Sequence, residues 1–359
     1  MRPHLPSLNA TFVALALASG LHAQTTVTVT GAKLSLVTDA ADQNVRLEVG
    51  PVTGEVRVYG FPGISDGTSF SGITSALVKT GGGNDQFALD ALTFGDFAVA
   101  VDTGAGELST SVQWKVGVSA APVASTFDLV SIAGPNQFAN VEFVNDAAKA
   151  TFAARVVCAT SSTTKVLSVD PTDTLGVSYF GSAVNTTLEV TSRAQALNVA
   201  ARGSHTAIGN SVKYTINQNE PAPVNFATGL ALGPGNDSLE LLVNAPGSPL
   251  TLTGIVRARG GDDLLLVVPT AASTTSGLAL GGEAGADQLT FDVKGAFQLS
   301  PTLRTRLLGG AGNDLLTLQT DSAIVGSGLP NDLVPLIDGG ADFDLYKAFG
   351  EIVNCEGTF

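Results

Sequence analysis

The sequence predicts an all-β protein: a right-handed parallel β-solenoid, or β-helix, with Gly-Asp turns stacked on one side. Three observations support this prediction. A short Gly-Asp motif occurs six times, apolar residues alternate after each copy, and the later copies are evenly spaced. Charged residues make up only 14% of the chain, and the helix-favouring residues Lys and Glu are scarce, so strands are expected throughout.

Each copy of the motif ends on an aspartate that is followed by an alternating apolar run. The most regular copy runs from Gly309 to Leu318 (GGAGNDLLTL). The aspartates of the six copies are Asp85, Asp237, Asp263, Asp287, Asp314 and Asp344. Two residues after each aspartate lies a large, mainly apolar residue: Phe87, Leu239, Leu265, Leu289, Leu316 or Tyr346. Because side chains alternate along a strand, a strand is expected to leave each turn with one face buried.

Glycine precedes most of these aspartates by two residues. It occupies this position as Gly83, Gly235, Gly261, Gly285 and Gly312, and Asp342 replaces it in the last copy. Glycine at a fixed turn position predicts a backbone conformation with positive φ, which a Cβ would penalise. Aspartate tolerates the left-handed region better than most residues, so Asp342 is expected to adopt it too.

The spacing of the last five copies predicts one rung of the solenoid for each copy. Successive aspartates from Asp237 to Asp344 are 26, 24, 27 and 30 residues apart. A period of this size indicates one supersecondary unit per repeat, stacked on its neighbours. The 152 residues between Asp85 and Asp237 equal about six such units. Rungs with other corners are expected to fill that gap.

The motif resembles the calcium-binding nonapeptide repeat of RTX (hemolysin-type) proteins, GGxGxDxUx, in which U is a large apolar residue. Gly309 to Thr317 matches this pattern in full, and the other five copies depart from it at one or two positions. The family packs its nonapeptides in direct tandem, whereas each copy here stands alone in its rung. The resemblance implies a secreted bacterial protein with a parallel β-roll and with calcium held between stacked turns.

Calcium is the cofactor that this resemblance implies, in a structural role. Its ligands would be turn carbonyls and the side chains of Asp85, Asp237, Asp262, Asp263, Asp287, Asn313, Asp314, Asp342 and Asp344. Stacked turns also bring like charges within several ångströms of one another, which is unfavourable without a counter-ion. Metal-free turn chemistry is the alternative, because Asn and Asp side chains bond nearby backbone N–H groups in ordinary tight turns.

The chain divides into four stretches. Residues 1–23 are predicted to be a signal peptide, since Arg2 precedes a short apolar run that is followed by small residues. Residues 24–103 are expected to form N-terminal solenoid rungs, and residues 225–359 a C-terminal repeat solenoid that ends in a cap. Residues 104–224 lack the Gly-Asp turn. They either continue the solenoid, which we favour, or form an inserted β-sandwich.

Charge and hydropathy limit the location and the partners of the protein. Without the signal peptide, 17 basic residues stand against 32 acidic ones, so nucleic acid and anionic membranes are not expected as partners. No later stretch is long and apolar enough to be a transmembrane segment. The protein is expected to be secreted, or to lie in the periplasm or cell envelope, and to meet calcium and a cell-surface polysaccharide or protein there.

Residues with catalytic potential are few, and none is predicted to be catalytic. Cys158 and Cys355 could pair after export, but several rungs would separate them in a straight stack, so free thiols are expected. His205 is expected to be an exposed loop residue without a partner cluster. The sequence contains no GxSxG, HExxH, P-loop or paired-cysteine zinc motif.

The function predicted from these observations is that of an exported calcium-binding β-solenoid, not an enzyme, with a structural or adhesive role at the cell envelope or outside the cell. The alternative is a polysaccharide-active enzyme, a lyase or hydrolase, on the same fold. Sugar hydrolysis uses two carboxylates at a defined separation, and Asp262 with Asp263, or Asp342 with Asp344, are the obvious pairs. Only Trp114 and four tyrosines are available for sugar stacking, which counts against the enzyme.

Overall fold

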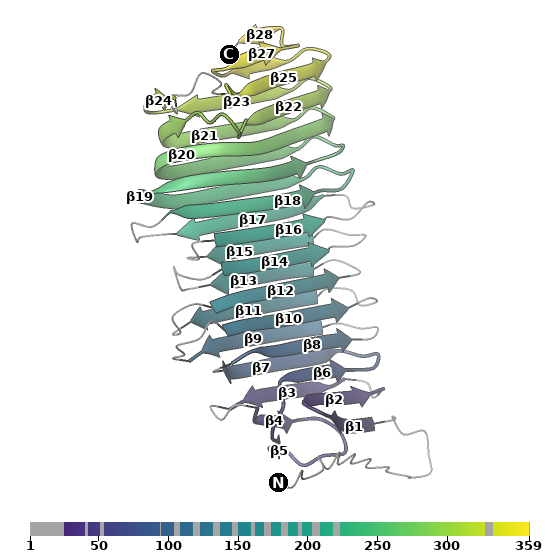
Figure 1. Cartoon of the computed structure of the whole chain (residues 1–359). Helices are drawn as coiled ribbons and strands as arrows, with labels where there is room; N and C mark the ends of the chain where they lie inside the picture. Colours follow the sequence, from purple (N-terminus) through teal and green to yellow (C-terminus); the bar gives the residue numbers. More distant parts are fainter. Residues whose placement is uncertain are drawn as a thin grey trace, which may run out of the picture.

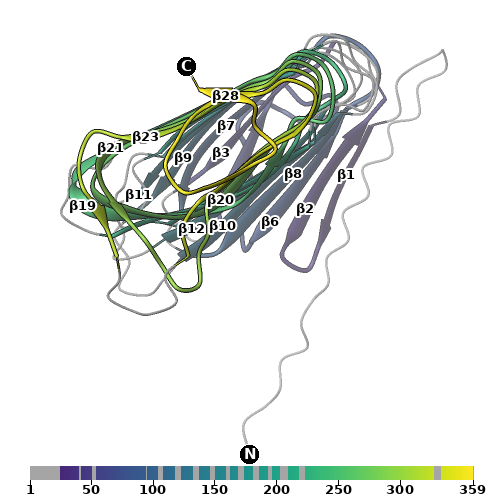
Figure 2. The same ribbon diagram turned by 90° about the horizontal axis from the view of Figure 1, so that it is seen from above.

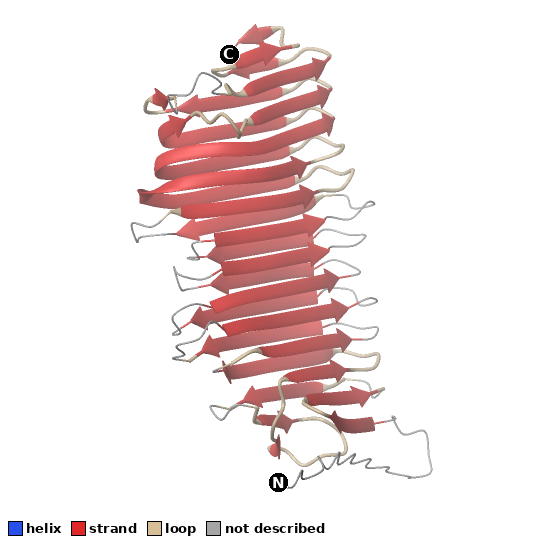
Figure 3. Ribbon diagram, viewed as in Figure 1, coloured by secondary structure: helices blue, strands red, loops and turns tan. Residues whose placement is uncertain are grey.

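A computed structural model describes most of the chain from residue 25 onward. Outside its description lie residues 1–24, 40–41, 51–53, 94, 104–107, 118–122, 132–136, 146–149, 159–161, 169–173, 181–185, 193–195, 203–208, 218–222, 327–332 and 359. The predicted signal peptide and His205 therefore fall outside the described residues. The described residues form 28 β-strands and no helix (Figure 3). Their structure accordingly includes no helix long and apolar enough to cross a membrane.

The strands stack into one elongated parallel β-solenoid with two faces (Figure 1). From the N-terminal end, the first face contains β2 (Lys33–Thr38), β6 (Ser75–Lys79), β8 (Phe97–Thr103), β10 (Val123–Ser131), β12 (Ala150–Cys158), β14 (Thr174–Phe180), β16 (Ala196–Arg202), β18 (Val224–Ala231), β22 (Arg306–Ala311), β25 (Leu336–Ala341) and β27 (Glu351–Val353).

The second face contains the strands that alternate with these along the chain. They are β3 (Asn44–Val49), β7 (Asp85–Thr93), β9 (Leu108–Val116), β11 (Gln137–Asn145), β13 (Ser162–Ser168), β15 (Thr186–Ser192), β17 (Asn210–Asn217), β21 (Gln288–Gln298), β23 (Leu315–Thr320), β26 (Leu345–Lys347) and β28 (Gly357–Thr358). Seen along its axis, the solenoid is a flattened loop (Figure 2). The predicted parallel β-solenoid is confirmed.

Two long strands run across both faces in the C-terminal half. β19 (Ser238–Arg257) pairs in parallel with β17 through its first half and with β18 through its second half. β20 (Leu264–Ala284) continues on top of β19, with a register shift between Ala245 and Pro249 that marks the bend between the faces. The short β24 (Ile324–Val325) pairs with the end of β21. Each rung in this region is therefore nearly continuous strand.

The middle of the chain continues the same stack without Gly-Asp turns. Every strand from β9 to β18 pairs in parallel with a strand of the preceding and of the following rung on its own face. Thr151 pairs with Thr174 and Ala196 pairs with Asn225, so the rungs keep a similar length here. A β-sandwich would require antiparallel strands, which are absent from this described stretch.

The core is a set of apolar ladders between the two faces. Leu239, Leu265, Leu289 and Leu316 pair with one another in successive rungs, and each is at most 2% exposed. They hold the same position after each turn, two residues beyond the aspartate, so the phase predicted from the alternation is confirmed. The vertical ladder forms because a rung rise of about 4.8 Å places equivalent side chains directly above one another.

The two ends of the stack differ from its middle. At the N-terminal end, β1 (Thr25–Thr30) pairs antiparallel with β2, and β3, β4 (Val56–Tyr59) and β5 (Thr68–Phe70) form an antiparallel meander. At the C-terminal end, the short strands β27 and β28 cover β25 and β26. Short or antiparallel strands at each end limit the length of unpaired strand edge that the solenoid exposes.

Candidate metal centre

Five of the six turn aspartates form one buried column along an edge of the solenoid. We call Asp237, Asp263, Asp287, Asp314 and Asp344 the aspartate column; each has at most 3% of its surface exposed. Each member stands at the end of its turn, directly before the second-face strand of its rung. Parallel pairing in constant register therefore places these residues above one another.

Each aspartate of the column binds the neighbouring rung through its Oδ1 atom. The backbone N–H of Asp237 donates to Oδ1 of Asp263 at 2.7 Å. The same bond joins Asp263 to Asp287 and Asp287 to Asp314, both at 2.9 Å, and Asp314 to Asp344 at 2.8 Å. One oxygen of each carboxyl group is thus used to hold five successive turns together, because buried backbone N–H groups must be satisfied.

Close stacking of the turns explains why glycine precedes the aspartates. A Cβ on Gly312 would lie 2.0 Å from the carbonyl oxygen of Gly285, a distance that no side chain tolerates. Positive φ occurs, as predicted, at Gly83, Gly261, Gly285, Gly312 and Asp342. The prediction is wrong for Gly235, which does not have positive φ. Gly235 belongs to the lowest turn of the column, below which no matching Gly-Asp turn lies.

The second carboxyl oxygen, Oδ2, lacks a hydrogen-bond partner in four members of the column. It is sealed from solvent in Asp263, Asp287, Asp314 and Asp344. Glycine five residues earlier leaves the space for it: a Cβ on Gly282 would lie 2.0 Å from Oδ2 of Asp287. A buried charged oxygen without a partner is strongly unfavourable. Each of these groups therefore requires either a proton or a cation.

Burial raises the pKa of every carboxyl group in the column. The pKa rises to about 7 for Asp263 and to about 6 for Asp314, because removal from water disfavours the charged form. The pKa values of Asp237, Asp287 and Asp344 are also raised, with burial as the largest cause. Neighbouring carboxylates add to the effect at Asp263. The column is thus an array of carboxyl groups that resist ionisation unless positive charge accompanies them.

The ends of the column are satisfied by other side chains. At the lower end, Asp237 receives the side-chain amide of Asn210 on Oδ1 and the backbone N–H of Gly233 on Oδ2, both at 2.8 Å. At the upper end, the N–H of Asp344 donates to a carboxylate oxygen of Glu356 at 2.8 Å. The role that Oδ1 plays between rungs is therefore taken over by Glu356 where the aspartates stop.

Asp85, the sixth turn aspartate, lies apart from the column in the N-terminal rungs. It accepts the backbone N–H of Gln43 on Oδ1 at 2.9 Å and the hydroxyl of Thr80 on Oδ2 at 2.6 Å. Both carboxyl oxygens are thus occupied. Unlike most members of the column, Asp85 therefore has no unpartnered carboxyl oxygen.

A second row of side chains, the outer row, lies on the exposed side of the same turns. Oδ1 of Asn236 accepts the N–H of Asp262 at 3.0 Å, and Oδ1 of Asp262 accepts the N–H of Ala286 at 2.9 Å. Asn313 accepts the N–H of Phe343 in the same way, at 3.1 Å. In the outer row, each side-chain oxygen accepts an N–H of the rung above, whereas each carboxyl group of the column accepts an N–H of the rung below. Adjacent residues of one turn therefore bond to the rungs on both sides.

The structure divides the nine predicted metal ligands into three groups. Buried with one unpartnered oxygen are Asp263, Asp287, Asp314 and Asp344. Buried with both oxygens occupied are Asp85 and Asp237. Exposed to solvent are Asp262, Asn313 and Asp342. Sequence reasoning missed Asn236 and Glu356; the Asn-Asp pair of the 236–237 turn was a signal for the first, whereas no local pattern marks the second.

A divalent cation at the column would need main-chain ligands as well as carboxylates. Among the described residues, no group of three or more His, Cys, Asp or Glu side chains is arranged to hold a metal ion. Calcium takes six to eight oxygen ligands, and turn carbonyls are common among them. The unpartnered Oδ2 atoms of neighbouring rungs fit such a mixed oxygen set, because they are the acceptors that the protein itself leaves unused.

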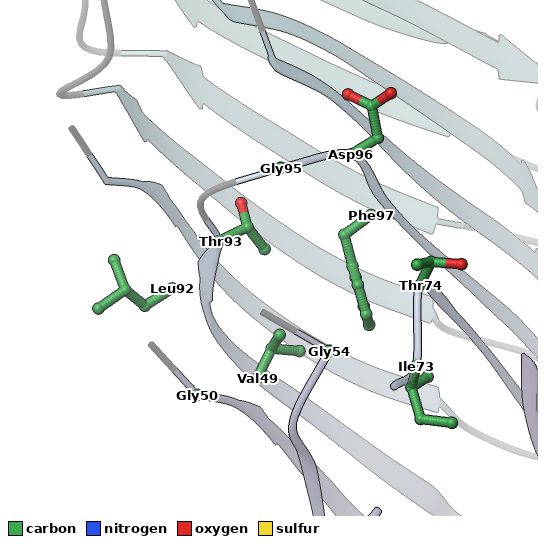
Figure 4. A pocket seen from close by; sticks show the side chains of 10 residues that line it. All are labelled: Val49, Gly50, Gly54, Ile73, Thr74, Leu92, Thr93, Gly95, Asp96 and Phe97. Atoms are coloured by element: carbon green, nitrogen blue, oxygen red, sulfur yellow. The ribbon is translucent and has the colours of Figure 1, made fainter. Parts of the chain in front are cut away.

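Three other features were candidates for a functional site: a small hollow, Trp114 and the two cysteines. The hollow in Figure 4 lies between the two faces near the N-terminal end and measures about 20 Å³, enough for about one water molecule. Trp114 is 1% exposed and donates to Thr93, so it is not available for stacking on a sugar. Cys355 is a half-buried free thiol. The side chain of Cys158 lies outside the described residues.

Comparison with known proteins adds no relative: no protein family, curated protein or solved structure matches this chain. The fold itself is compatible with an enzyme and with a protein that is not one. The chemistry of the aspartate column is therefore the basis for a functional proposal.

Proposed function

We propose that this protein is an exported β-solenoid that binds calcium along the aspartate column and serves as a structural or adhesive element at the cell envelope or outside the cell. The observation that carries the proposal is the row of unpartnered, solvent-sealed Oδ2 atoms in Asp263, Asp287, Asp314 and Asp344. Calcium would neutralise carboxylates that burial otherwise forces to remain protonated.

The role of calcium in this proposal is to tie rungs together. The chain already joins the turns through Oδ1, and a cation on Oδ2 would add a second link between the same rungs. Because calcium binds only the stacked turns of the folded protein, it would stabilise the solenoid by mass action. Extracellular calcium-binding modules work with dissociation constants of about 10⁻⁴–10⁻³ M, so weak sites suffice outside the cell.

The structural or adhesive role rests on the shape of the molecule and on the predicted export signal. A rigid, elongated stack presents two long faces to a partner at a cell surface. A polysaccharide or protein on that surface is the proposed partner. Export agrees with the calcium requirement, since free calcium is plentiful outside the cytoplasm.

Thermal unfolding with and without calcium tests the metal part of the proposal. Millimolar calcium should raise the melting temperature, EDTA should reverse the rise, and calorimetry should detect binding. Asp314→Asn should reduce both the rise in melting temperature and the calorimetric binding of calcium. The amide keeps an oxygen for the N–H of Asp287 but removes the charge. The matched control is Asp262→Asn in the outer row, whose Oδ1 bond to Ala286 an amide also preserves.

The two variants separate the proposed site from its alternatives. Asp262→Asn should leave the calcium effect intact. If Asp262→Asn abolished the effect and Asp314→Asn did not, the cation would lie on the outer row and the proposal for the column would be wrong. If calcium left the melting temperature unchanged and calorimetry detected no heat of calcium binding, the aspartates would be turn formers with protonated carboxyl groups.

A further inference from the structure

We propose that the first face of the solenoid carries a binding site for a small amphipathic carboxylate, a ligand with one carboxylate group on a compact apolar body. The site is a hollow of about 290 Å³ on the outer side of β19, β20 and β22. It lies outside the aspartate column, and the proposal does not depend on calcium binding.

The hollow exists because one rung carries small side chains between two rungs with large ones. Its floor is formed by Ala279 and Gly281 of β20. In the rung below, Ile255 pairs with Ala279 and Arg257 with Gly281. In the rung above, Arg306 pairs with Ala279 and Leu308 with Gly281. The walls on either side of the floor are thus each made of one aliphatic and one cationic side chain.

The width of the hollow follows from the stacking of the rungs. Adjacent strands are about 4.8 Å apart, so the backbones of the two walls are about 10 Å apart across the floor. Arg257 and Leu308 lie on opposite sides of Gly281, and Ile255 and Arg306 lie on opposite sides of Ala279. The two arginines are therefore placed diagonally across the floor. A ligand that lies on the floor would touch apolar surface and a guanidinium group on both sides.

The two arginines of the walls differ in their surroundings from six other cations of the described residues. Six other Lys and Arg side chains form ion pairs with nearby acids, namely Arg46, Arg57, Lys79, Lys213, Lys294 and Arg304. Neither Arg257 nor Arg306 forms an ion pair or a side-chain hydrogen bond with a described residue. In a chain with a net charge of −14, two arginines that face one hollow without an acidic partner leave a local positive site.

The chemistry of the walls selects the class of ligand. Guanidinium groups bind carboxylates and phosphates through paired N–H donors, so an anion of one of these two classes is expected. Ile255 is 48% exposed and Leu308 is half-buried, and both would be covered by an apolar body. Glu283 also borders the hollow, so two arginines and one glutamate leave one net positive charge, which a singly charged carboxylate balances and a doubly charged phosphate exceeds. A single carboxylate with an aliphatic body satisfies all three constraints.

Calorimetric titration of the full mature chain with hexanoate tests this site. Hexanoate should bind saturably, in the millimolar range or tighter as expected for so small a ligand. Hexanol, which keeps the chain but lacks the charge, and acetate, which keeps the carboxylate but lacks most of the chain, should each bind at least tenfold more weakly. Equal binding of hexanol or acetate would overturn the assignment of an amphipathic carboxylate.

Two variants place the binding in the hollow. Arg306→Gln removes one charge, and Gly281→Leu fills the floor; a Cβ at Gly281 would meet only the carbonyl oxygen of Val256 at 3.7 Å, so the variant should fold. Each variant should weaken hexanoate binding at least tenfold, and an unchanged circular dichroism spectrum should show that it is folded. Arg57→Gln, at an arginine already paired with Glu55, is the matched control and should change the hexanoate affinity less than twofold.

Binding to both variants with wild-type affinity would show that hexanoate lies elsewhere and would overturn the proposal, as would the absence of saturation at tens of millimolar. Asp314→Asn should bind hexanoate like the wild type. This result keeps the outcome for the hollow distinct from the outcome for calcium.

Discussion

A single aspartate in each turn has two separate tasks, one for each carboxyl oxygen. Oδ1 of Asp287, for example, satisfies the N–H of Asp263 in the rung below, whereas its Oδ2 is buried without a partner. The neighbouring residue of the same turn points outward and bonds in the other direction, as Asp262 does to Ala286. Two adjacent residues of one turn therefore have opposite environments, and burial raises the pKa of the inner one, Asp263.

The apolar residue that follows each turn aspartate by two positions is a buried core residue in four successive rungs, as Leu239, Leu265, Leu289 and Leu316. Leu316→Ala should lower the free energy of unfolding by about 2–5 kcal/mol, because Leu316 is fully buried between Leu289 and Tyr346 of the adjacent rungs. The matched control is Leu264→Ala, at a leucine that is 45% exposed, with an expected change within about 0.5 kcal/mol. Denaturant unfolding measures both. Equal costs for the two variants would contradict the ladder.

At the scale of the element, the stacked turns act as one unit. Each turn supplies an N–H to the carboxyl group above it and a carboxyl oxygen to the N–H below it, from Asp237 up to Asp344. The glycines allow the turns to approach, since Gly285 and Gly312 stack on the carbonyl oxygens beneath them. Loss of one member therefore breaks bonds in two rungs. Neighbouring positions in the column should show non-additive mutational effects.

The raised pKa values predict how the stability of the metal-free protein depends on pH. In the unfolded chain aspartate titrates near pH 4, whereas the folded pKa is about 7 for Asp263 and about 6 for Asp314. Between these values the folded state binds more protons than the unfolded state, so stability falls as pH rises. The contribution is fully present below about pH 4 and is lost above about pH 7. In EDTA, the melting temperature should therefore be higher at pH 5 than at pH 8.

A neutral variant isolates the column from the general charge of the protein. Asp263→Asn should flatten this pH dependence, whereas Asp90→Asn, at an exposed carboxylate with 60% of its side chain accessible, should leave the slope unchanged. Calcium should restore the melting temperature most strongly at pH 8, because its ligands must be deprotonated. A melting temperature in EDTA that stays constant or rises from pH 5 to pH 8 would show that the column is not buried as described.

At the scale of the whole molecule, the solenoid is a linear stack whose rungs contact only their neighbours. Such proteins depend on their end structures, because a bare terminal rung exposes the unpaired edges of its strands. At the C-terminal end, β27 and β28 cover the last rung, and Glu356 supplies the final carboxylate for the N–H of Asp344. Arg304 also bonds to Glu351 and ties this end to the rung below.

Removal of residues 351–359 tests the importance of this end. The shortened chain should associate through the exposed edges of β25 and β26, and light scattering after size-exclusion chromatography should detect a higher mass than that of the full chain. Glu356→Gln is the control, because it keeps both strands and an oxygen that can accept the N–H of Asp344. A shortened chain with unchanged mass and melting temperature would show that the last strands are not a cap.

The sequence by itself determined the repeat and its phase. Alternation places Leu239, Leu265, Leu289 and Leu316 on the buried side of their strands, and spacing of 24 to 27 residues places them in successive rungs. Both properties are local, since they depend on strand period and turn chemistry, and both are present in the structure. The positive φ of Gly312 and Asp342 follows from the same local reasoning, whereas Gly235 departs from it.

Only the tertiary structure decided which oxygens are free and where the hollow lies. Asp262 and Asp263 are adjacent in one motif, yet one is exposed and the other is 3% exposed. The bond partners of these carboxyl groups lie 24 to 30 residues away, and so do the residues around Ala279 and Gly281. A local pattern does not specify such partners. They are set by the register between rungs, which exists only once the strands have paired.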